Sequence, residues 1–186
     1  MTFGTALFFT YAILSRMAYV LFVGVSLHRE DADHRYTQRF GRDGAFRRFK
    51  RTASIIMNHD AFAFIVLCVA TRGSWDLPVP GSVSFILGTV LAIIGVGIKL
   101  WAARTLGSDA YYWHNFFDPD NARGFVATGP YRYVSSPMYT IGYLQTYGLA
   151  LITRSLPGMI AAAFLQAAII VFYFAVEKPH FRRLHG

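Results

Sequence analysis

Long apolar stretches separated by short polar segments dominate the pattern of this 186-residue chain. An α-helix needs about 20 apolar residues to cross roughly 30 Å of hydrocarbon. Five stretches come close to that length or exceed it, and they cover residues 3–27, 53–71, 83–101, 138–153 and 156–176. The pattern therefore predicts an all-α integral membrane protein with about five transmembrane helices, folded as one domain over residues 1–186.

The last two stretches are predicted to form a tight antiparallel hairpin. Only Arg154 and Ser155 separate them, and Pro157 follows at a position where it helps to break the chain. The first stretch is too long for a removable signal peptide and lacks the small-residue cleavage pattern. We therefore expect residues 3–27 to form a spanning helix.

The distribution of Lys and Arg predicts how the chain is oriented. Segments 28–52 and 102–137 and the tail from Glu177 together carry fourteen, whereas the alternate loops carry only Arg72 and Arg154. Basic residues favour the cytoplasmic side, so we expect the N-terminus outside and the C-terminus in the cytoplasm. Segment 28–52 holds eight of the fourteen, which favours anionic lipid headgroups as its partner. No nucleic-acid recognition motif accompanies this charge, so no nucleic-acid partner is expected.

Several polar residues interrupt the apolar stretches. Arg16 lies in the first, and Asn58, His59 and Asp60 lie in the second. Arg16 and Asp60 have comparable depths, which permits an ion pair; the alternatives are snorkelling, a proton relay or a contribution to a substrate pocket. Lys99 is expected to snorkel to the cytoplasmic interface.

Two glycines and the single cysteine in the apolar stretches are explained without any role in an active site. Gly95 and Gly97 are expected to allow close helix packing, since no strand precedes them as a nucleotide fingerprint requires. Cys68 is the single cysteine, so it forms neither an intrachain disulfide nor a multi-cysteine metal site, and no metal is predicted.

The segment GPYRYVSSPMY, residues 129–139, carries the most specific candidate chemistry. Gly129 and Pro130 predict a turn, and Pro137 is expected to start the fourth helix with Ser135 or Ser136 as its cap. Arg132 beside two hydroxyls and a helix N-terminus suits a carboxylate or phosphate.

Residues 123–151, together with residues 176–179, resemble a family of integral-membrane methyltransferases. That family includes the isoprenylcysteine carboxyl methyltransferases and the phospholipid N-methyltransferases. The shared elements are a Gly-x-Tyr turn, a Pro-x-Tyr start to the penultimate helix, a short helical hairpin, and an acidic residue before a Pro at the end of the last helix. The resemblance implies that S-adenosylmethionine binds at the cytoplasmic face, between loop 102–137 and tail 177–186.

The resemblance also implies roles for individual residues. Phe125 and Val126 would contact the adenine, Tyr131 and Tyr139 would line the pocket, and Glu177 would accept hydrogen bonds. Our own chemical argument adds Arg132 or the N-terminus of the fourth helix as the holder of the methionine carboxylate. The predicted cofactor-binding set is Phe125, Val126, Gly129, Tyr131, Arg132, Ser136, Pro137, Tyr139 and Glu177.

Departures from the family pattern bear on the substrate. Ser135 and Ser136 stand where the carboxyl methyltransferases have Arg-His, which favours a lipid amine such as phosphatidylethanolamine or its methylated derivatives. A carboxyl methyltransferase of a lipophilic substrate is the alternative, and a non-enzymatic lipid-binding protein is the second alternative. Lys178 replaces the second acidic residue, and Gly142 follows the Tyr one residue later than usual.

Methyl transfer to an amine requires removal of a proton from the ammonium. Asp109, His114 and Glu177 are the candidate catalytic residues on the cytoplasmic side. Tyr111, Tyr112 and Trp113 are candidates for binding the substrate, since aromatic faces attract a methylated ammonium. An interfacial belt that has no role in binding suits them better still.

Overall fold

The computed structural model describes residues 2–121 and 128–185, and all regular secondary structure in these ranges is helical. The long helices are α1 (Phe3–Asp33), α3 (Arg42–Ala70), α4 (Gly81–Leu106) and α7 (Leu156–Phe172). The shorter ones are α2 (Arg35–Phe40), α5 (Ser108–Tyr111), α6 (Leu144–Thr153) and α8 (Lys178–His185). Single turns η1 (His114–Phe116), η2 (Pro119–Asn121), η3 (Gly129–Arg132) and η4 (Ile141–Tyr143) are 3-10 helices, and η5 (Tyr173–Glu177) is a π-helix. The all-α class is confirmed.

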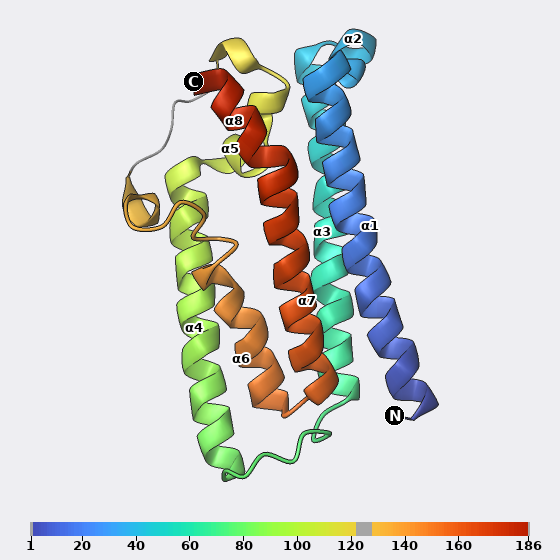
Figure 1. Ribbon diagram of the computed structural model, residues 1–186, viewed down its shortest axis with the longest axis vertical. Coiled ribbons are helices and arrows are strands. Elements are labelled where there is room, and N and C mark those ends of the chain that lie inside the picture. The colour runs from blue at the N-terminus through green and yellow to red at the C-terminus, as the bar shows by residue number, and fades with distance from the viewer. Residues whose placement is uncertain (1, 122–127, 186) are drawn as a thin grey trace.

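Within the described residues, four helices are long and apolar enough to cross a membrane: α1, α3, α4 and the continuous segment Leu156–Leu184. The stretch 138–153 forms a shorter helix than predicted. Its helix α6 has ten residues, or about 15 Å, which is half the thickness of the hydrocarbon. Nevertheless the chain before α6 descends from the end that carries α5, and the two termini lie at opposite ends of the bundle (Figure 1).

The prediction that Pro137 starts the fourth helix is wrong. Residues 137–140 form a turn in which the Ser136 carbonyl accepts hydrogen bonds from the Tyr139 and Thr140 N–H groups, both at 3.1 Å. The Thr140 hydroxyl donates to the same carbonyl at 2.9 Å. These bonds close a turn at residues 137–140, so the backbone does not continue from Pro137 as a helix. The helix α6 begins only at Leu144.

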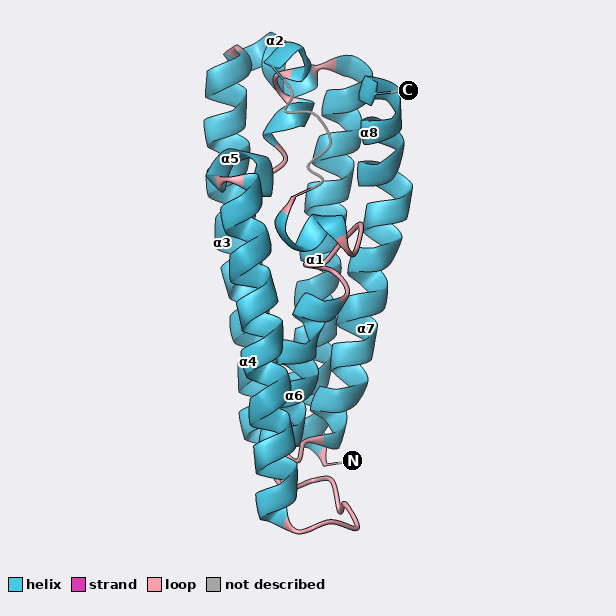
Figure 2. Ribbon diagram, turned by 90° about the vertical axis from the view of Figure 1, so that its left-hand side faces the viewer, coloured by secondary structure: helices cyan, strands magenta, loops and turns pink. Residues whose placement is uncertain are grey.

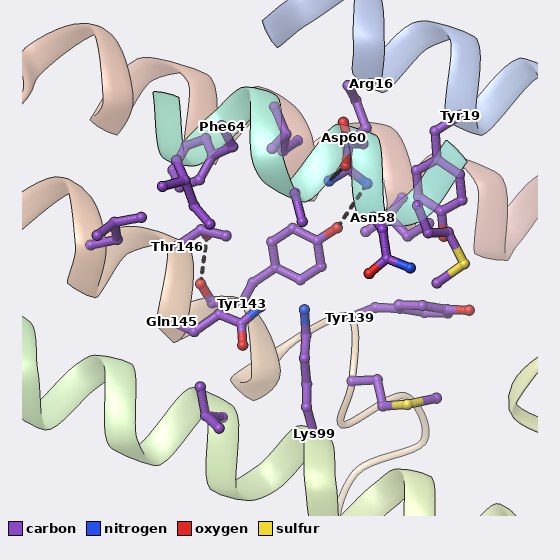
Figure 3. A pocket seen from close by; sticks show the side chains of 18 of the residues that line it. Arg16, Tyr19, Asn58, Asp60, Phe64, Lys99, Tyr139, Tyr143, Gln145 and Thr146 are labelled. Atoms are coloured by element: carbon purple, nitrogen blue, oxygen red, sulfur yellow. Dashed lines mark hydrogen bonds and ion pairs between the residues drawn. The ribbon is translucent and has the colours of Figure 1, made fainter. Parts of the chain in front are cut away.

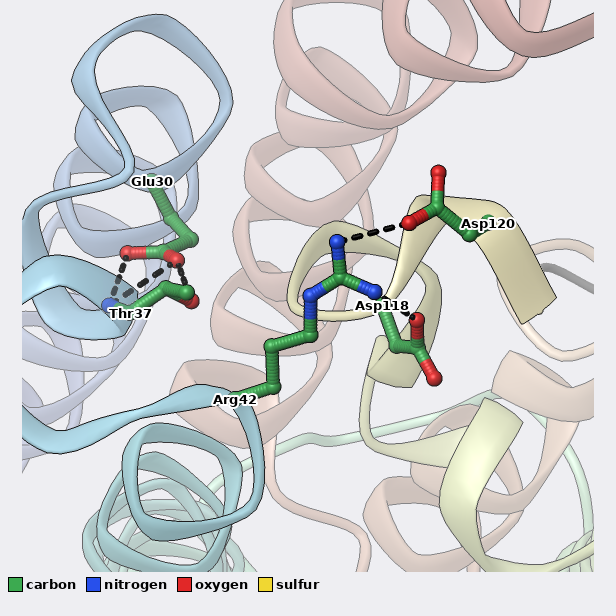
Figure 4. Close-up of polar contacts among 5 residues, drawn as sticks. All are labelled: Glu30, Thr37, Arg42, Asp118 and Asp120. Atoms are coloured by element: carbon green, nitrogen blue, oxygen red, sulfur yellow. Dashed lines mark hydrogen bonds and ion pairs between the residues drawn. The ribbon is translucent and has the colours of Figure 1, made fainter.

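Segment 28–52, which separates the first two apolar stretches, is mostly helix. α1 continues to Asp33, and α3 starts at Arg42. The buried Glu30 carboxylate accepts the backbone N–H groups of Tyr36 at 2.7 Å and Thr37 at 3.2 Å, so it satisfies the start of α2 (Figure 4). The two spanning helices therefore extend beyond the apolar stretches and are joined by one short capped helix.

The helices form two groups that share α7. α1 packs mainly on α3 and α7, whereas α4 packs mainly on α6 (Figures 1 and 2). The predicted hairpin of α6 and α7 is present. Arg154 turns the chain with a φ of 50°, and the Ser155 hydroxyl accepts the Gly158 N–H at 2.8 Å.

Glycines allow α4 and α6 to approach closely. A Cβ built on Gly148 would lie 2.5 Å from the Gly88 carbonyl oxygen, and one on Gly95 would overlap the Gln145 backbone. The packing role predicted for Gly95 is therefore confirmed. No atom of the part of the chain that the structure describes lies within 4 Å of such a Cβ on Gly97, so its predicted packing role is wrong.

We expect Gly95→Ala to destabilise the protein by about 1–3 kcal/mol, because the added methyl forces α4 away from α6. Gly97→Ala is the matched control on the same helix and should leave stability unchanged or slightly raised. Thermal unfolding of both variants in one detergent measures the difference. Equal midpoints for the two variants would refute the close packing.

Candidate functional site

The loop that follows α4 is fixed to the end of α3 by ion pairs. Arg42 contacts Asp118 at 3.0 Å and Asp120 at 2.6 Å (Figure 4), and Lys50 contacts Asp109 at 2.8 Å. Phe117 is buried and packs on Phe46 and Phe49 of α3. Two of the eight basic residues in segment 28–52 therefore bind the loop.

A cavity of about 500 Å³ lies below this loop, between α1, α3, α4, α6, α7 and the segment that leads into α6 (Figure 3). Tyr111, Tyr112, Trp113 and Tyr139 line the end nearest the loop. The structure thus brings the three predicted substrate-binding aromatics together with a predicted cofactor residue.

Glu177 is linked to the same end of the cavity. The Tyr139 hydroxyl donates a hydrogen bond to the Glu177 carboxylate at 2.9 Å, and the Trp113 side chain hydrogen-bonds the same carboxylate. Glu177 ends the π-helix η5, which changes the helical register between α7 and α8. The Glu177 carboxylate therefore connects Tyr139 of the predicted cofactor-binding set with Trp113 of the predicted substrate-binding set.

Tyr131 and Gly129 are held beside this arrangement. The Tyr131 hydroxyl is buried without a hydrogen-bond partner among the described residues, and burial together with the Glu177 charge raises the pKa of Tyr131. Gly129 has a φ of 58°, and a Cβ there would lie 2.6 Å from the Thr105 hydroxyl at the end of α4. The predicted Gly129 turn therefore places Tyr131 against the site.

Other predicted residues are located elsewhere. Asp109 and His114 line a separate cavity of about 220 Å³. The hydrogen bond from Lys50 lowers the pKa of the Asp109 carboxyl, and the His114 ring packs edge-on against Phe46 at 4.6 Å between centroids. Asp109 thus remains an ionised surface partner of Lys50.

The remaining predicted cofactor residues divide into two groups. Arg132 is exposed, while Ser136 and Pro137 belong to the turn before Tyr139 and cap no helix. The predicted anion site at a helix N-terminus is therefore absent from this described turn. Phe125 and Val126 lie outside the described residues.

The middle of the cavity contains an ion pair at membrane depth. Arg16 of α1 contacts Asp60 of α3 at 2.6 Å, and Arg16 also donates to the Tyr143 hydroxyl at 3.1 Å (Figure 3). Both charged side chains are about 95% buried, so the ion pair that their depths permitted is confirmed. Both residues also line the cavity.

Lys99 and Tyr143 are cavity residues that sequence reasoning did not assign. Lys99 lies seven residues before the end of α4, and its Nζ is 4.8 Å from the Tyr143 ring centroid, directed into the cavity (Figure 3). Its predicted snorkelling is wrong. For Lys99, the signal in the sequence was a charge without an obvious partner in an apolar helix. Tyr143 gave no such signal, because it lies in the stretch 138–153 that was predicted to be a spanning helix.

Comparisons with known proteins agree on one family. The family model described as phospholipid methyltransferase matches residues 83–186. The phosphatidylethanolamine N-methyltransferase of Debaryomyces hansenii is 29% identical over 148 residues, which are 74% of this chain and 17% of that protein. The enzyme of the same name from Saccharomyces cerevisiae is 34% identical over 101 residues, 54% of this chain and 12% of that protein. No solved structure matches.

The coverage of these matches is uneven. The chain spans about a sixth of the length of the curated relatives it matches. The matched family segment begins within α4, so it contains Lys99, Tyr139 and Glu177 but excludes Arg16 and Asp60. One wall of the cavity therefore comes from helices outside that segment.

The buried ion pair predicts a non-additive pattern of stability. Arg16→Met and Asp60→Leu should each cost about 3–5 kcal/mol, because each leaves an uncompensated charge in the membrane. The double variant should be more stable than either single variant, since it removes both charges. Unfolding of all three proteins in lipid nanodiscs measures this, and strictly additive losses would show that the two charges are not coupled.

Proposed function

Because the chain belongs to the phospholipid methyltransferase family, we propose that it transfers a methyl group from S-adenosylmethionine to the amine of phosphatidylethanolamine or of its methylated derivatives. The observation that carries this proposal is the arrangement around Glu177. Tyr139, predicted for the cofactor, and Trp113, predicted for the substrate, both bind its carboxylate. One site can therefore hold both reactants.

The residues around Glu177 fit the cofactor by their chemistry. A carboxylate accepts hydrogen bonds from ribose hydroxyls or an amino group, and the unpartnered Tyr131 hydroxyl offers a further buried polar contact. Tyr139, Tyr131 and Glu177 would hold S-adenosylmethionine, with Gly129 fixing the turn before them. When bound, the cofactor supplies an electrophilic methyl group on a sulfonium.

The chain must then align a neutral amine with that methyl group and exclude water. Tyr111, Tyr112 and Trp113 line the end of the cavity nearest the loop, and their faces can surround a methylated ammonium. Glu177 is the best-placed proton acceptor among the three candidates, since Asp109 and His114 line the other cavity. Its two bonded neighbours also hold the carboxylate in place.

We expect Glu177→Gln to lower methyl transfer into phosphatidylethanolamine at least about 100-fold, because it removes the proton acceptor while preserving size. His114→Ala is the control, and its rate and pH profile should match those of the unaltered protein. Purified protein in mixed micelles with methyl-labelled S-adenosylmethionine provides the measurement. An active Glu177→Gln protein, or label that enters only carboxyl esters, would contradict the proposal.

We further propose that the site faces the cytoplasm and that anionic headgroups surround the end of the bundle that carries it. Apart from Arg42 and Lys50, segment 28–52 carries six basic residues at this end: Arg29, Arg35, Arg39, Arg47, Arg48 and Arg51. An anionic inner leaflet would attract them.

A cysteine-labelling experiment tests the orientation. Cys68 is buried and can be replaced by Ser, after which Arg72→Cys or Arg182→Cys places one exposed thiol at either end. A membrane-impermeant maleimide should label Arg72→Cys in intact cells and Arg182→Cys only after permeabilisation. The reverse pattern would place the site on the outer face.

A further inference from the structure

The charges in the large cavity differ between the end nearest the loop and its middle. Glu177 is bonded to residues that line the end nearest the loop, whereas Arg16, Lys99 and Asp60 line the middle, between that end and Phe64 and Thr146 (Figure 3). Arg16 is already paired with Asp60 at 2.6 Å. Lys99 has no carboxylate within ion-pair distance among the described residues, and it remains an excess cation there.

The fold makes room for Lys99 to reach the cavity. Its side chain passes Gly142, where an added Cβ would lie 2.7 Å from the Lys99 Cγ. The Nζ then lies near the Tyr143 ring, between Tyr143 and Tyr139 (Figure 3). An ammonium group in apolar surroundings is costly unless an anion accompanies it. The arrangement therefore favours an anionic ligand.

The cavity also has a side that faces lipid. α3 packs mainly on α1 and α4 packs mainly on α6, so the cavity separates α3 from α4. Ile65 of α3 and Val96 of α4 line it and are 47% and 44% exposed. Asn58 of α3 is an exposed polar residue that lines the same cavity. A lipid can approach between these two helices without crossing the protein.

We propose that Lys99, beside the Arg16–Asp60 pair, binds the phosphodiester of a phospholipid that enters between α3 and α4. This inference rests on the proposed function and adds a subsite to it. In phosphatidylethanolamine a short ethylene linker joins the phosphate to the amine. With the phosphate at Lys99, the amine extends toward Tyr111, Tyr112 and Glu177. The zwitterion then matches the cations in the middle of the cavity and the Glu177 carboxylate beside its loop end.

The kinetic test uses Lys99→Met, which keeps most of the length of the side chain and removes the charge. At saturating cofactor, the apparent KM for phosphatidylethanolamine should rise about ten-fold or more, as expected for the loss of a charged hydrogen bond. The Kd for S-adenosylmethionine should stay unchanged, and Lys99→Arg should restore part of the lipid affinity. A raised Kd for S-adenosylmethionine would instead assign Lys99 to the cofactor carboxylate and overturn the proposal.

Arg104→Met is the matched control, because Arg104 is an exposed cation on the same helix. Its KM for the lipid should equal that of the unaltered protein. A Lys99→Met protein that unfolds at the same temperature as the control establishes that the fold is intact. An unchanged KM for Lys99→Met would refute the subsite.

A binding measurement separates this proposal from the proposed function. Native mass spectrometry from micelles with equal amounts of phosphatidylethanolamine and diacylglycerol needs no methyl transfer. The unaltered protein should retain the phospholipid in preference, and Lys99→Met should lose that preference. If no methyl is transferred but the preference depends on Lys99, the proposed function fails and the subsite stands. If methyl transfer occurs but the preference is indifferent to Lys99, only the subsite fails.

Discussion

The ion pair between Arg16 and Asp60 determines the arrangement on which the site depends. It joins α1 to α3 inside the membrane, and the Arg16 bond to Tyr143 adds the segment that leads into α6. A buried ion pair seldom adds net stability over apolar residues of similar size, because both charges lose their hydration. Here the ion pair holds α1, α3 and the segment that leads into α6 around a polar cavity. An apolar contact at the same place would let these three segments close the cavity.

The loop after α4 completes this arrangement from the other end. Arg42 and Lys50 attach the loop to α3, and Trp113 thereby reaches the Glu177 carboxylate at the end of the last long helix. The cavity thus has aromatic faces at its loop end, with the Glu177 carboxylate bonded beside them, and cations in its middle. This polarity suits a zwitterionic headgroup better than a lipophilic carboxylate, which carries only negative charge.

The fold class and four of the spanning helices followed from apolar length, and the hairpin followed from the two residues between α6 and α7. The turn at residues 137–140 could not be predicted, because composition does not reveal that the Ser136 carbonyl is used three times. The family resemblance placed Tyr139 and Glu177 in one cofactor site, but their direct hydrogen bond was not predicted. Lys99 was misassigned because its helix continues for seven residues beyond it, and its direction depends on contact with Gly142.

Photo-crosslinking in membranes tests most directly whether a phospholipid occupies the cavity. A phosphatidylethanolamine with a diazirine near its glycerol would be activated, and the modified residues would be mapped by peptide mass spectrometry. The account predicts crosslinks at cavity residues of α3 and α4, such as Ala61, Ile65 and Val96, that excess unlabelled phosphatidylethanolamine suppresses. Crosslinks confined to outward-facing residues such as Phe62 and Ile93, with none in the cavity, would contradict it.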